Sequence, residues 1–251
     1  MKSVLGGRLE ERGHGPFLSR EAVKYIAIFT MTLNHAAHCF LQQGTFWYQL
    51  LVGLGYFTAP VMCCFLTEGF AHTRSRKKYA LRLLAFALIS QYPFALAFPG
   101  ETGTLNMIFT LFLCLCLLMA MERLEGSLLR LPVILGLTAL TAMGDWGIVA
   151  PLMVYEFQGA RGDQKKTGVV FGAVSAFAAV NEVALGLEAG AGLFRSLLYG
   201  LFSGAGPFLA GVVVLFLYDQ KKAPRGGRFS KWFFYVYYPA HLLALGLLSR
   251  F

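Results

Sequence analysis

Two histidines within long apolar segments are the residues of this sequence best placed to do chemistry. His35 follows Lys24 by eleven residues, and His241 follows Lys231 by ten. At a helical rise of 1.5 Å per residue these separations are about 16 Å and about 15 Å, which is half of a hydrocarbon core roughly 30 Å thick. Ionisable groups are costly inside a membrane. The pair therefore indicates either a functional site at mid-depth or two hydrogen-bonded histidines that pack helices together.

A third histidine raises the question of a metal ion. His38 lies one helical turn after His35 and nearly on the same face of the helix. A protein metal site needs a third ligand in fixed geometry, and no carboxylate stands at matching spacing in this segment. We therefore expect no metal, and expect His38 to point towards the outer membrane interface.

Charged residues cluster at the inner end of the second and third apolar segments. Glu68 lies about 9 Å inside the membrane by helical rise, where we expect it to pair with Arg82, one turn into the next segment. The loop between the two segments could bind phosphate groups, or could simply set the orientation of the chain in the membrane. Its basic residues are His72, Arg74, Arg76, Lys77 and Lys78.

Two short polar turns are expected at the opposite side of the membrane. Asn106 follows the turn formed by residues 99–104, near the outer end of the fourth apolar segment. Asp145 and Trp146 form another outer turn, where Asp145 could cap a helix and the indole could anchor at the interface.

The composition defines the elements that must position these side chains. Of the 251 residues, 57% are hydrophobic and 14% are charged, whereas soluble domains carry roughly 25% charged residues. Several apolar blocks approach or exceed the roughly 18–20 residues that span a bilayer as a helix. These features exclude soluble, disordered and fibrous proteins. The five cysteines all lie in apolar blocks and are interpreted as packing residues.

The predicted fold is an all-α polytopic membrane bundle of about nine transmembrane helices, with eight to ten as the range. Residues 1–22 form a cytoplasmic tail, and residues 23–251 form one transmembrane domain. Pro207 is expected to kink or break the eighth helix. The expected spans are 23–43, 47–70, 80–98, 105–121, 127–143, 146–158, 168–187, 193–218 and 232–249.

The distribution of basic residues orients this arrangement. With the N-terminus inside, every Lys and Arg except Arg195 and Arg250 falls on the inner side. Because basic residues are enriched in cytoplasmic loops, the pattern places the N-terminus in the cytoplasm and the C-terminus outside. It also explains the net charge of +9 without a nucleic-acid partner.

A series of short motifs occurs in a fixed order along the chain: residues 24–35, Pro60, residues 68–74, 78–83, 90–94, 105–110, 145–147 and 237–241. This series resembles the TraX family of membrane proteins, which is named for its link to acetylation of the pilin N-terminus. The resemblance is good over residues 23–158 and moderate in the last helix. That family usually has Asp before the first-helix histidine, where this chain has Asn34.

The resemblance implies an integral membrane acyltransferase of the bacterial inner membrane. Acetyl-CoA, bound in the cytoplasm by the basic loop with Arg82 at the mouth of a tunnel, would donate its acetyl group near His35. The histidine would act as general base or would carry the acetyl group itself. His241 would handle a proton or position a substrate, and Asn34 would orient His35. The developing oxyanion would be stabilised by Asn106, Gln91 and Thr110.

Alternatives from other classes stay open at this stage. A small-solute transporter would also have a polar cavity at mid-depth, although transporters commonly show internal repeats; a scaffold without turnover is a third reading. The expected partners are the acyl-CoA donor, membrane lipids and an acceptor, which is a pilin N-terminus or an envelope glycan or polymer. A dimer is one option for the oligomeric state.

Overall fold

The computed structural model describes residues 17–101, 103–219 and 227–251. Within these ranges the chain is helical, as the sequence predicted, and forms no strand beyond two isolated bridges. Residues 1–16 of the predicted tail lie outside the described residues. Several of the basic residues that were used to predict the orientation of the chain lie outside them too. In chain order the elements are α1 (Arg20–Phe40), α2 (Phe46–Gly55), α3 (Thr58–His72), α4 (Arg76–Ala97), α5 (Met107–Arg123), α6 (Arg130–Thr141), α7 (Val149–Gly159), α8 (Gln164–Glu188), α9 (Leu193–Val212), the π-helical turn η1 (Val213–Leu217) and α10 (Gly227–Leu248).

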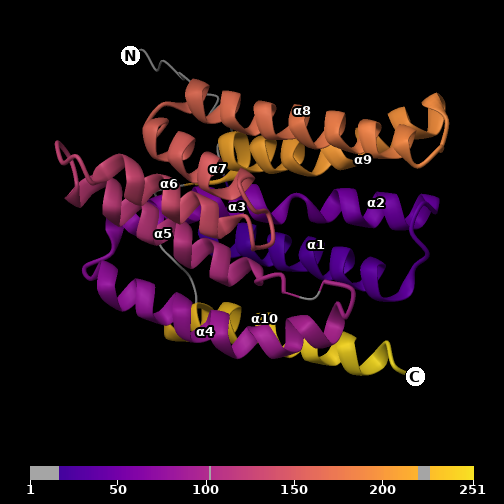
Figure 1. The fold of residues 1–251 in the computed structure, drawn as a ribbon, viewed down its shortest axis with the longest axis horizontal. Helices are drawn as coiled ribbons and strands as arrows, with labels where there is room; N and C mark the ends of the chain where they lie inside the picture. Colours follow the sequence, from indigo (N-terminus) through magenta and orange to yellow (C-terminus); the bar gives the residue numbers. More distant parts are fainter. Residues whose placement is uncertain (1–16, 102, 220–226) are drawn as a thin grey trace, which may run out of the picture.

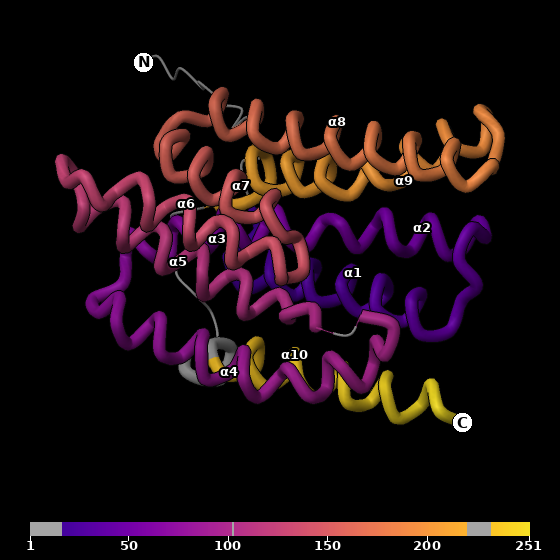
Figure 2. The backbone as a smooth tube through the Cα atoms, viewed as in Figure 1, coloured from indigo at the N-terminus to yellow at the C-terminus, as the bar shows by residue number. Residues whose placement is uncertain are grey.

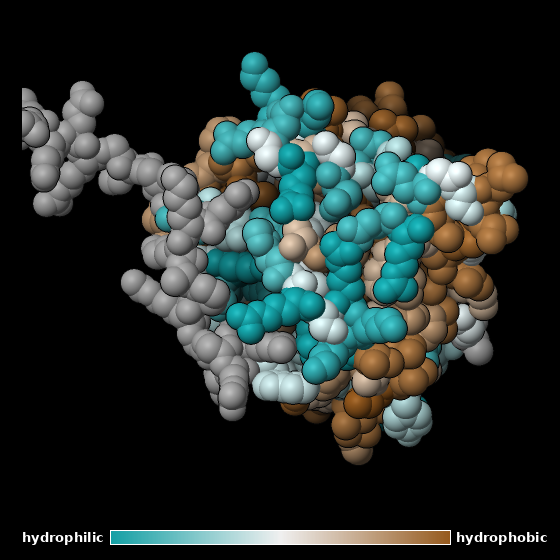
Figure 3. Space-filling view, turned by 90° about the vertical axis from the view of Figure 1, so that its left-hand side faces the viewer, coloured by the Kyte–Doolittle hydropathy of each residue, from teal (hydrophilic) through white to brown (hydrophobic). Residues whose placement is uncertain are grey.

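The long helices lie roughly side by side, so that the molecule has two ends (Figure 1). We call the end at which α1, α4 and α8 begin the basic end, and the opposite one, with the connection from α1 to α2, the far end. Hydrophilic residues gather on the basic end and hydrophobic residues surround them (Figure 3). Large apolar side chains such as Phe29, Leu81 and Val180 are exposed on the flanks. This distribution suits a bundle whose flanks contact lipid.

Polar residues at the helix ends explain where several helices begin. The side chains of Ser19, Thr45, Ser75 and Asp163 accept hydrogen bonds from backbone N–H groups in the first turns of α1, α2, α4 and α8. Such caps satisfy N–H groups that lack an intrahelical acceptor.

Nine complete spans are not confirmed. Among the described residues, four helical segments are long and apolar enough to cross a membrane: Phe46–His72, Arg76–Ala97, Gln164–Glu188 and Leu193–Leu217. The spans expected at 127–143 and 146–158 are α6 and α7, with 12 and 11 residues. At 1.5 Å per residue they are about 18 Å and about 16 Å long, too short for a core of roughly 30 Å.

Instead, α6 and α7 form a hairpin that enters the bundle from the basic end and returns to it. Its tip, residues 142–148, lies in the middle of the molecule, while α8 and α9 continue to the far end (Figure 2). The placement of Asp145 and Trp146 in an outer turn was therefore wrong. The error left the count of basic residues unaffected, because Arg130 and Arg161 lie at the same end of the hairpin.

The second and eighth expected spans also differ from the predictions. The second is divided into α2 and α3 by a break at Tyr56–Phe57, which the sequence analysis missed. The eighth passes through Pro207 without ending, and departs from α-helical geometry only in η1. Glycines allow close contact around the break: a Cβ on Gly206 would lie 2.2 Å from the carbonyl oxygen of Gly53.

Candidate functional site

The two membrane histidines meet across α1 and α10. Nδ1 of His35 lies 2.8 Å from Nε2 of His241, and both side chains are buried. The ring of His241 also stacks on Tyr237, whose hydroxyl lies 2.8 Å from Oγ1 of Thr32 on α1. The predicted common depth of the histidines thus corresponds to direct contact, held by a second bond between the same helices.

The hydrogen bonds of this pair determine where its protons lie. Nδ1 of His241 is 3.0 Å from the backbone carbonyl oxygen of Tyr237. A carbonyl oxygen only accepts, so this Nδ1 carries the proton, and Nε2 of the neutral His241 must accept from Nδ1–H of His35. With the tautomers assigned from this network, Nε2 of His35 keeps a free lone pair. It is therefore ready to take up a proton or to attack an electrophile.

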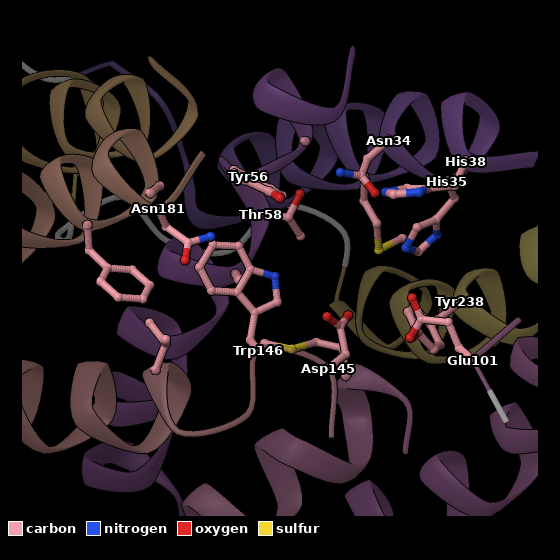
Figure 4. A pocket seen from close by; sticks show the side chains of 17 residues that line it. Asn34, His35, His38, Tyr56, Thr58, Glu101, Asp145, Trp146, Asn181 and Tyr238 are labelled. Carbon is pink, nitrogen blue, oxygen red and sulfur yellow. The ribbon is translucent and has the colours of Figure 1, made fainter. Parts of the chain in front are cut away.

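His35 lines a cavity of about 340 Å³, which we call the histidine cavity (Figure 4). The carboxylates of Glu101 and Asp145 line it too, and among its lining residues there is no Lys or Arg. Its wall also includes Asn34, His38, Tyr56, Thr58, Trp146, Asn181 and Tyr238.

A second cavity, of about 420 Å³, opens towards the basic end, and we call it the basic cavity. Three cationic side chains, Arg20, Lys24 and Arg82, line it together with the single carboxylate of Glu21. Aromatic rings fix these cations: Arg82 donates from Nε to the Tyr235 hydroxyl at 3.2 Å, and Nζ of Lys24 lies 5.0 Å from the ring centroid of Phe234.

The two cavities adjoin. Four residues line both of them: Met31, Thr58, Met107 and Tyr238. We call these four the junction. We call the two cavities and the junction between them the passage, which is mainly basic on one side of the junction and acidic on the other.

Interruptions of regular helix build the histidine cavity. Gly55 at the end of α2 approaches α1 so closely that a Cβ there would lie 2.2 Å from Cβ of Asn34. The break after it lets α3 begin at Thr58, whose hydroxyl donates to the carbonyl oxygen of Ala27 at 2.7 Å. Broken helices are tolerated at membrane depth where the backbone lines a cavity.

The tip of the α6–α7 hairpin supplies another wall. Trp146 adopts a φ of 59°, a left-handed conformation that is uncommon outside glycine. The tip is held by backbone bonds to Leu105, and Oγ1 of Thr110 donates to the carbonyl oxygen of Asp145 at 2.8 Å. This anchoring brings the Asp145 carboxylate and the indole into the histidine cavity.

The three neutral residues predicted to stabilise an oxyanion are committed to structural bonds. The side chain of Asn106 caps α5 through Oδ1 and donates from Nδ2 to the Ala87 carbonyl and to Oε1 of Gln91. Gln91 in turn donates to the carbonyl of Thr104, and Thr110 holds the hairpin tip. None of the three lines either cavity, so we leave them out of the chemistry.

Asn34 faces the histidine cavity without orienting the imidazole. Its Nδ2 donates to the carbonyl oxygen of Val52 at 3.1 Å and so ties α1 to α2. The group that holds His35 is His241 instead. His38, one turn further along α1, has its Nδ1 3.0 Å from the hydroxyl of Tyr48.

The expected pair of Glu68 with Arg82 was wrong. Glu68 lies 3.9 Å from Arg20 and accepts from the Tyr218 hydroxyl at 3.1 Å, whereas Arg82 bonds Tyr235. The reason is packing: α4 lies mainly against α10 and α5, so its arginine meets the aromatic residues of α10 before it reaches α3.

The basic loop borders the basic cavity but does not line it. Thr73 and Tyr79 are lining residues, whereas the cationic side chains between them are not. Arg76 forms an ion pair with Glu122 and lies 4.1 Å from the ring centroid of Phe70. The residues outside the lining are His72, Arg74, Arg76, Lys77 and Lys78.

Several residues of the passage are not among those predicted from the sequence. Arg20 and Lys24 indicate only orientation in the sequence, although they stand at the start of the helix that carries His35. Tyr238 lies three residues before His241, a spacing that places two helical residues on one face and could have identified it.

The fold and the site together define a class: a multi-pass helical membrane protein with a histidine pair inside a polar passage. The chain matches the family model described as TraX protein over residues 19–249, and it belongs to that family, as its motifs indicated. It is 32% identical over 235 residues to the probable fimbrial assembly protein FimC, serogroup H1, of Dichelobacter nodosus, covering 89% of this chain and 92% of that protein. No solved structure matches it.

Proposed function

We propose that this protein is a membrane acetyltransferase that uses acetyl-CoA and His35. The observation that carries the proposal is the free lone pair on Nε2 of His35. It lies in a passage that is mainly basic on one side of the junction and acidic on the other. A base at this place can activate an acceptor for attack on a thioester.

The basic cavity suits the donor. Arg82 and Arg20 carry guanidinium groups, which recognise phosphate oxygens well, and Lys24 adds a third cation. The nucleotide of acetyl-CoA would stay at the basic end near Arg74 and the rest of the loop, while its narrow pantetheine arm enters the cavity. Since cytoplasmic segments are rich in Lys and Arg, we assign the basic end to the cytoplasmic face of the bacterial inner membrane.

The histidine cavity suits an acceptor that arrives from the far end. Glu101 and Asp145 would attract a protonated amine, and one of these carboxylates would take the first proton, so that a neutral amine attacks. The fimbrial relative supports a pilin N-terminus as that acceptor, with an envelope glycan or polymer as the other option. Nε2 of His35 takes the acceptor proton, and the nucleophile attacks the thioester carbon directly.

The test is acetyl transfer by the purified protein in nanodiscs, with labelled acetyl-CoA and a peptide or sugar acceptor. The variant His35→Ala should lose transfer by about 10²–10⁴-fold, the range that general-base catalysis contributes. Cys39→Ala, one turn further along α1 and outside both cavities, serves as control and should keep the wild-type rate. Equal rates for wild type and His35→Ala, with both folded, would reject the proposal.

A further inference from the structure

One hydroxyl of the junction has no acceptor for its hydrogen. Tyr238 is 6% exposed, and among the described residues no group accepts a hydrogen bond from its hydroxyl. The hydroxyl of Thr58, the other polar side chain of the junction, is bonded to Ala27. A buried hydroxyl without a partner costs free energy. In a well-packed protein such a group points to a ligand that supplies the missing bond.

A backbone N–H lies beside this hydroxyl. Met107 is the first residue of α5, a helix of 17 residues, and its backbone N–H interacts with the Tyr238 side chain. The cap residue Asn106 uses its Oδ1 for the next two N–H groups, those of Ile108 and Phe109, at 3.1 and 3.3 Å. The N–H of Met107 is therefore left out of the cap, at the positive end of the helix dipole.

We propose that the Tyr238 hydroxyl and the Met107 N–H form the site that receives the carbonyl oxygen of the donor thioester and stabilises it as an oxyanion. The inference rests on the proposed function and adds the electrophile-binding half of the site. Both residues line both cavities. A thioester that enters from the basic cavity thus reaches these donors at the junction, where the histidine cavity begins.

The position relative to His35 fits this role. The ring of Tyr238 lies edge-on to His35 and to His241, with centroids 6.4 and 5.6 Å away. Met31, another junction residue, is one turn before His35 on α1. Tyr238, Met107 and His35 are thus neighbours in the wall of the histidine cavity, where oxyanion donors and a base can act on one carbonyl group.

The reaction balances with groups that the proposal names. The acceptor lone pair forms a bond to the carbonyl carbon, the acceptor proton passes to Nε2 of His35, and the carbonyl π electrons move onto oxygen. Tyr238 O–H and Met107 N–H hydrogen-bond that oxyanion. When the oxyanion collapses, the carbon–sulfur bond breaks, and the CoA thiolate leaves and takes the proton from His35.

The first test is Tyr238→Phe, measured as acetyl transfer with saturating acetyl-CoA. Removing one oxyanion donor should lower kcat by about 10²–10³-fold, with KM for acetyl-CoA little changed. The melting temperature should stay the same or rise, since the lost hydroxyl donates to no acceptor. The matched control is Tyr199→Phe: Tyr199 is equally buried and donates to the carbonyl of Gly44 at 2.6 Å, so its loss should lower stability and leave kcat unchanged.

The second test removes the backbone donor. Met107→Pro deletes the N–H at the first helical position, where proline is tolerated, and Asn106 has the φ of −66° and ψ of 161° that suit a residue before proline. Met107→Ala removes the side chain and keeps the N–H. We expect Met107→Pro to lower kcat about 10²-fold relative to Met107→Ala.

A spectroscopic readout separates this role from a structural one. The carbonyl stretch of bound [1-¹³C]acetyl-CoA, recorded without acceptor, should lie at lower frequency in wild type than in Tyr238→Phe, because a hydrogen bond polarises the carbonyl. If wild type transfers acetyl groups while Tyr238→Phe and Met107→Pro keep its kcat and its carbonyl frequency, the oxyanion site is wrong and the proposed function stands. If wild type transfers none, the proposed function fails, and the oxyanion site fails with it.

Discussion

The basic cavity and the histidine cavity have similar volumes, about 420 and 340 Å³, and opposite chemistry. The first is lined by three cations, Arg20, Lys24 and Arg82, and one carboxylate, Glu21. The second is lined by two carboxylates and two histidines, with no Lys or Arg. One bundle thus offers a place for an anionic molecule and a place for a cationic one, separated only by the junction. This difference in charge is what the proposed function requires, in which an anionic donor and a cationic acceptor meet at the junction.

The cavities also differ in how they are built. Intact helices, α1, α3, α4 and α10, provide most of the basic cavity. The histidine cavity depends on the break between α2 and α3, the connection before α5 and the tip of the α6–α7 hairpin. Breaks in regular helix allow side chains from several elements to point into one cavity. A straight helix that faces lipid does not offer this arrangement.

The largest effect within this comparison should come from the histidine pair. His241→Phe removes the acceptor that fixes the tautomer of His35, and should lower the acetyl-transfer rate by about 10²–10⁴-fold, the full contribution of a positioned base. His241→Gln can still accept from Nδ1 of His35 through its amide oxygen, so it should recover part of the rate. Equal rates for the two variants would show that the hydrogen bond does not matter.

The charge of the basic cavity should affect the donor alone. Arg82→Gln removes a guanidinium from the cavity wall, and we expect KM for acetyl-CoA to rise about tenfold with kcat retained. The double variant Arg74→Gln, Arg76→Gln is the matched control from the loop. Because those residues do not line the cavity and Arg76 is paired with Glu122, it should raise KM less, and mostly at low salt. A larger rise in KM for the loop variant than for Arg82→Gln would show that the loop, and not the cavity wall, binds the phosphates.

The charge of the histidine cavity should affect the acceptor alone. Asp145→Asn keeps the size of the side chain and removes its charge. We expect KM for an amine acceptor to rise roughly fivefold, as for one ion pair of about 1 kcal/mol, with KM for acetyl-CoA unchanged. A neutral sugar acceptor should be insensitive. A response with the sugar and none with the amine would contradict the assignment of this cavity to a cationic acceptor.

The smallest effect on turnover should come from Asn34→Asp. The substitution removes the donor to the Val52 carbonyl and places a carboxylate beside that oxygen. The free energy of unfolding should therefore fall by about 1–3 kcal/mol. The pH profile of transfer should stay the same, since the partner of His35 is His241. A shift of the profile to higher pH would show that position 34 contacts the imidazole after all.

Hydropathy and charge predicted much of this fold because they indicate whether a segment lies among apolar groups or in water. Each expected span corresponds to a helix or a pair of helices, and the shared depth of His35 and His241 followed from residue counts alone. Hydropathy cannot tell a helix that crosses the membrane from one that turns back inside it. The α6–α7 hairpin was therefore misread, and Asp145 was placed at the wrong depth.

The partners of polar side chains were much harder to predict. Asn106 and Gln91 looked like free donors, yet they bond backbone groups exposed by the irregular connection before α5. Tyr238 looked like one more aromatic residue of a membrane helix. Whether a polar atom is occupied or free depends on tertiary neighbours, which spacing along the chain does not encode.

The junction has a consequence for the electrical insulation of a cell. In an energised membrane each elementary charge that crosses 100 mV releases about 2.3 kcal/mol, so an open aqueous path here would waste the proton gradient. Met31 and Met107 bring flexible, apolar thioethers to the junction, and such side chains can mould around a slender guest. Under the proposed function, the pantetheine arm that delivers the two-carbon fragment would itself fill the junction and keep ions from crossing.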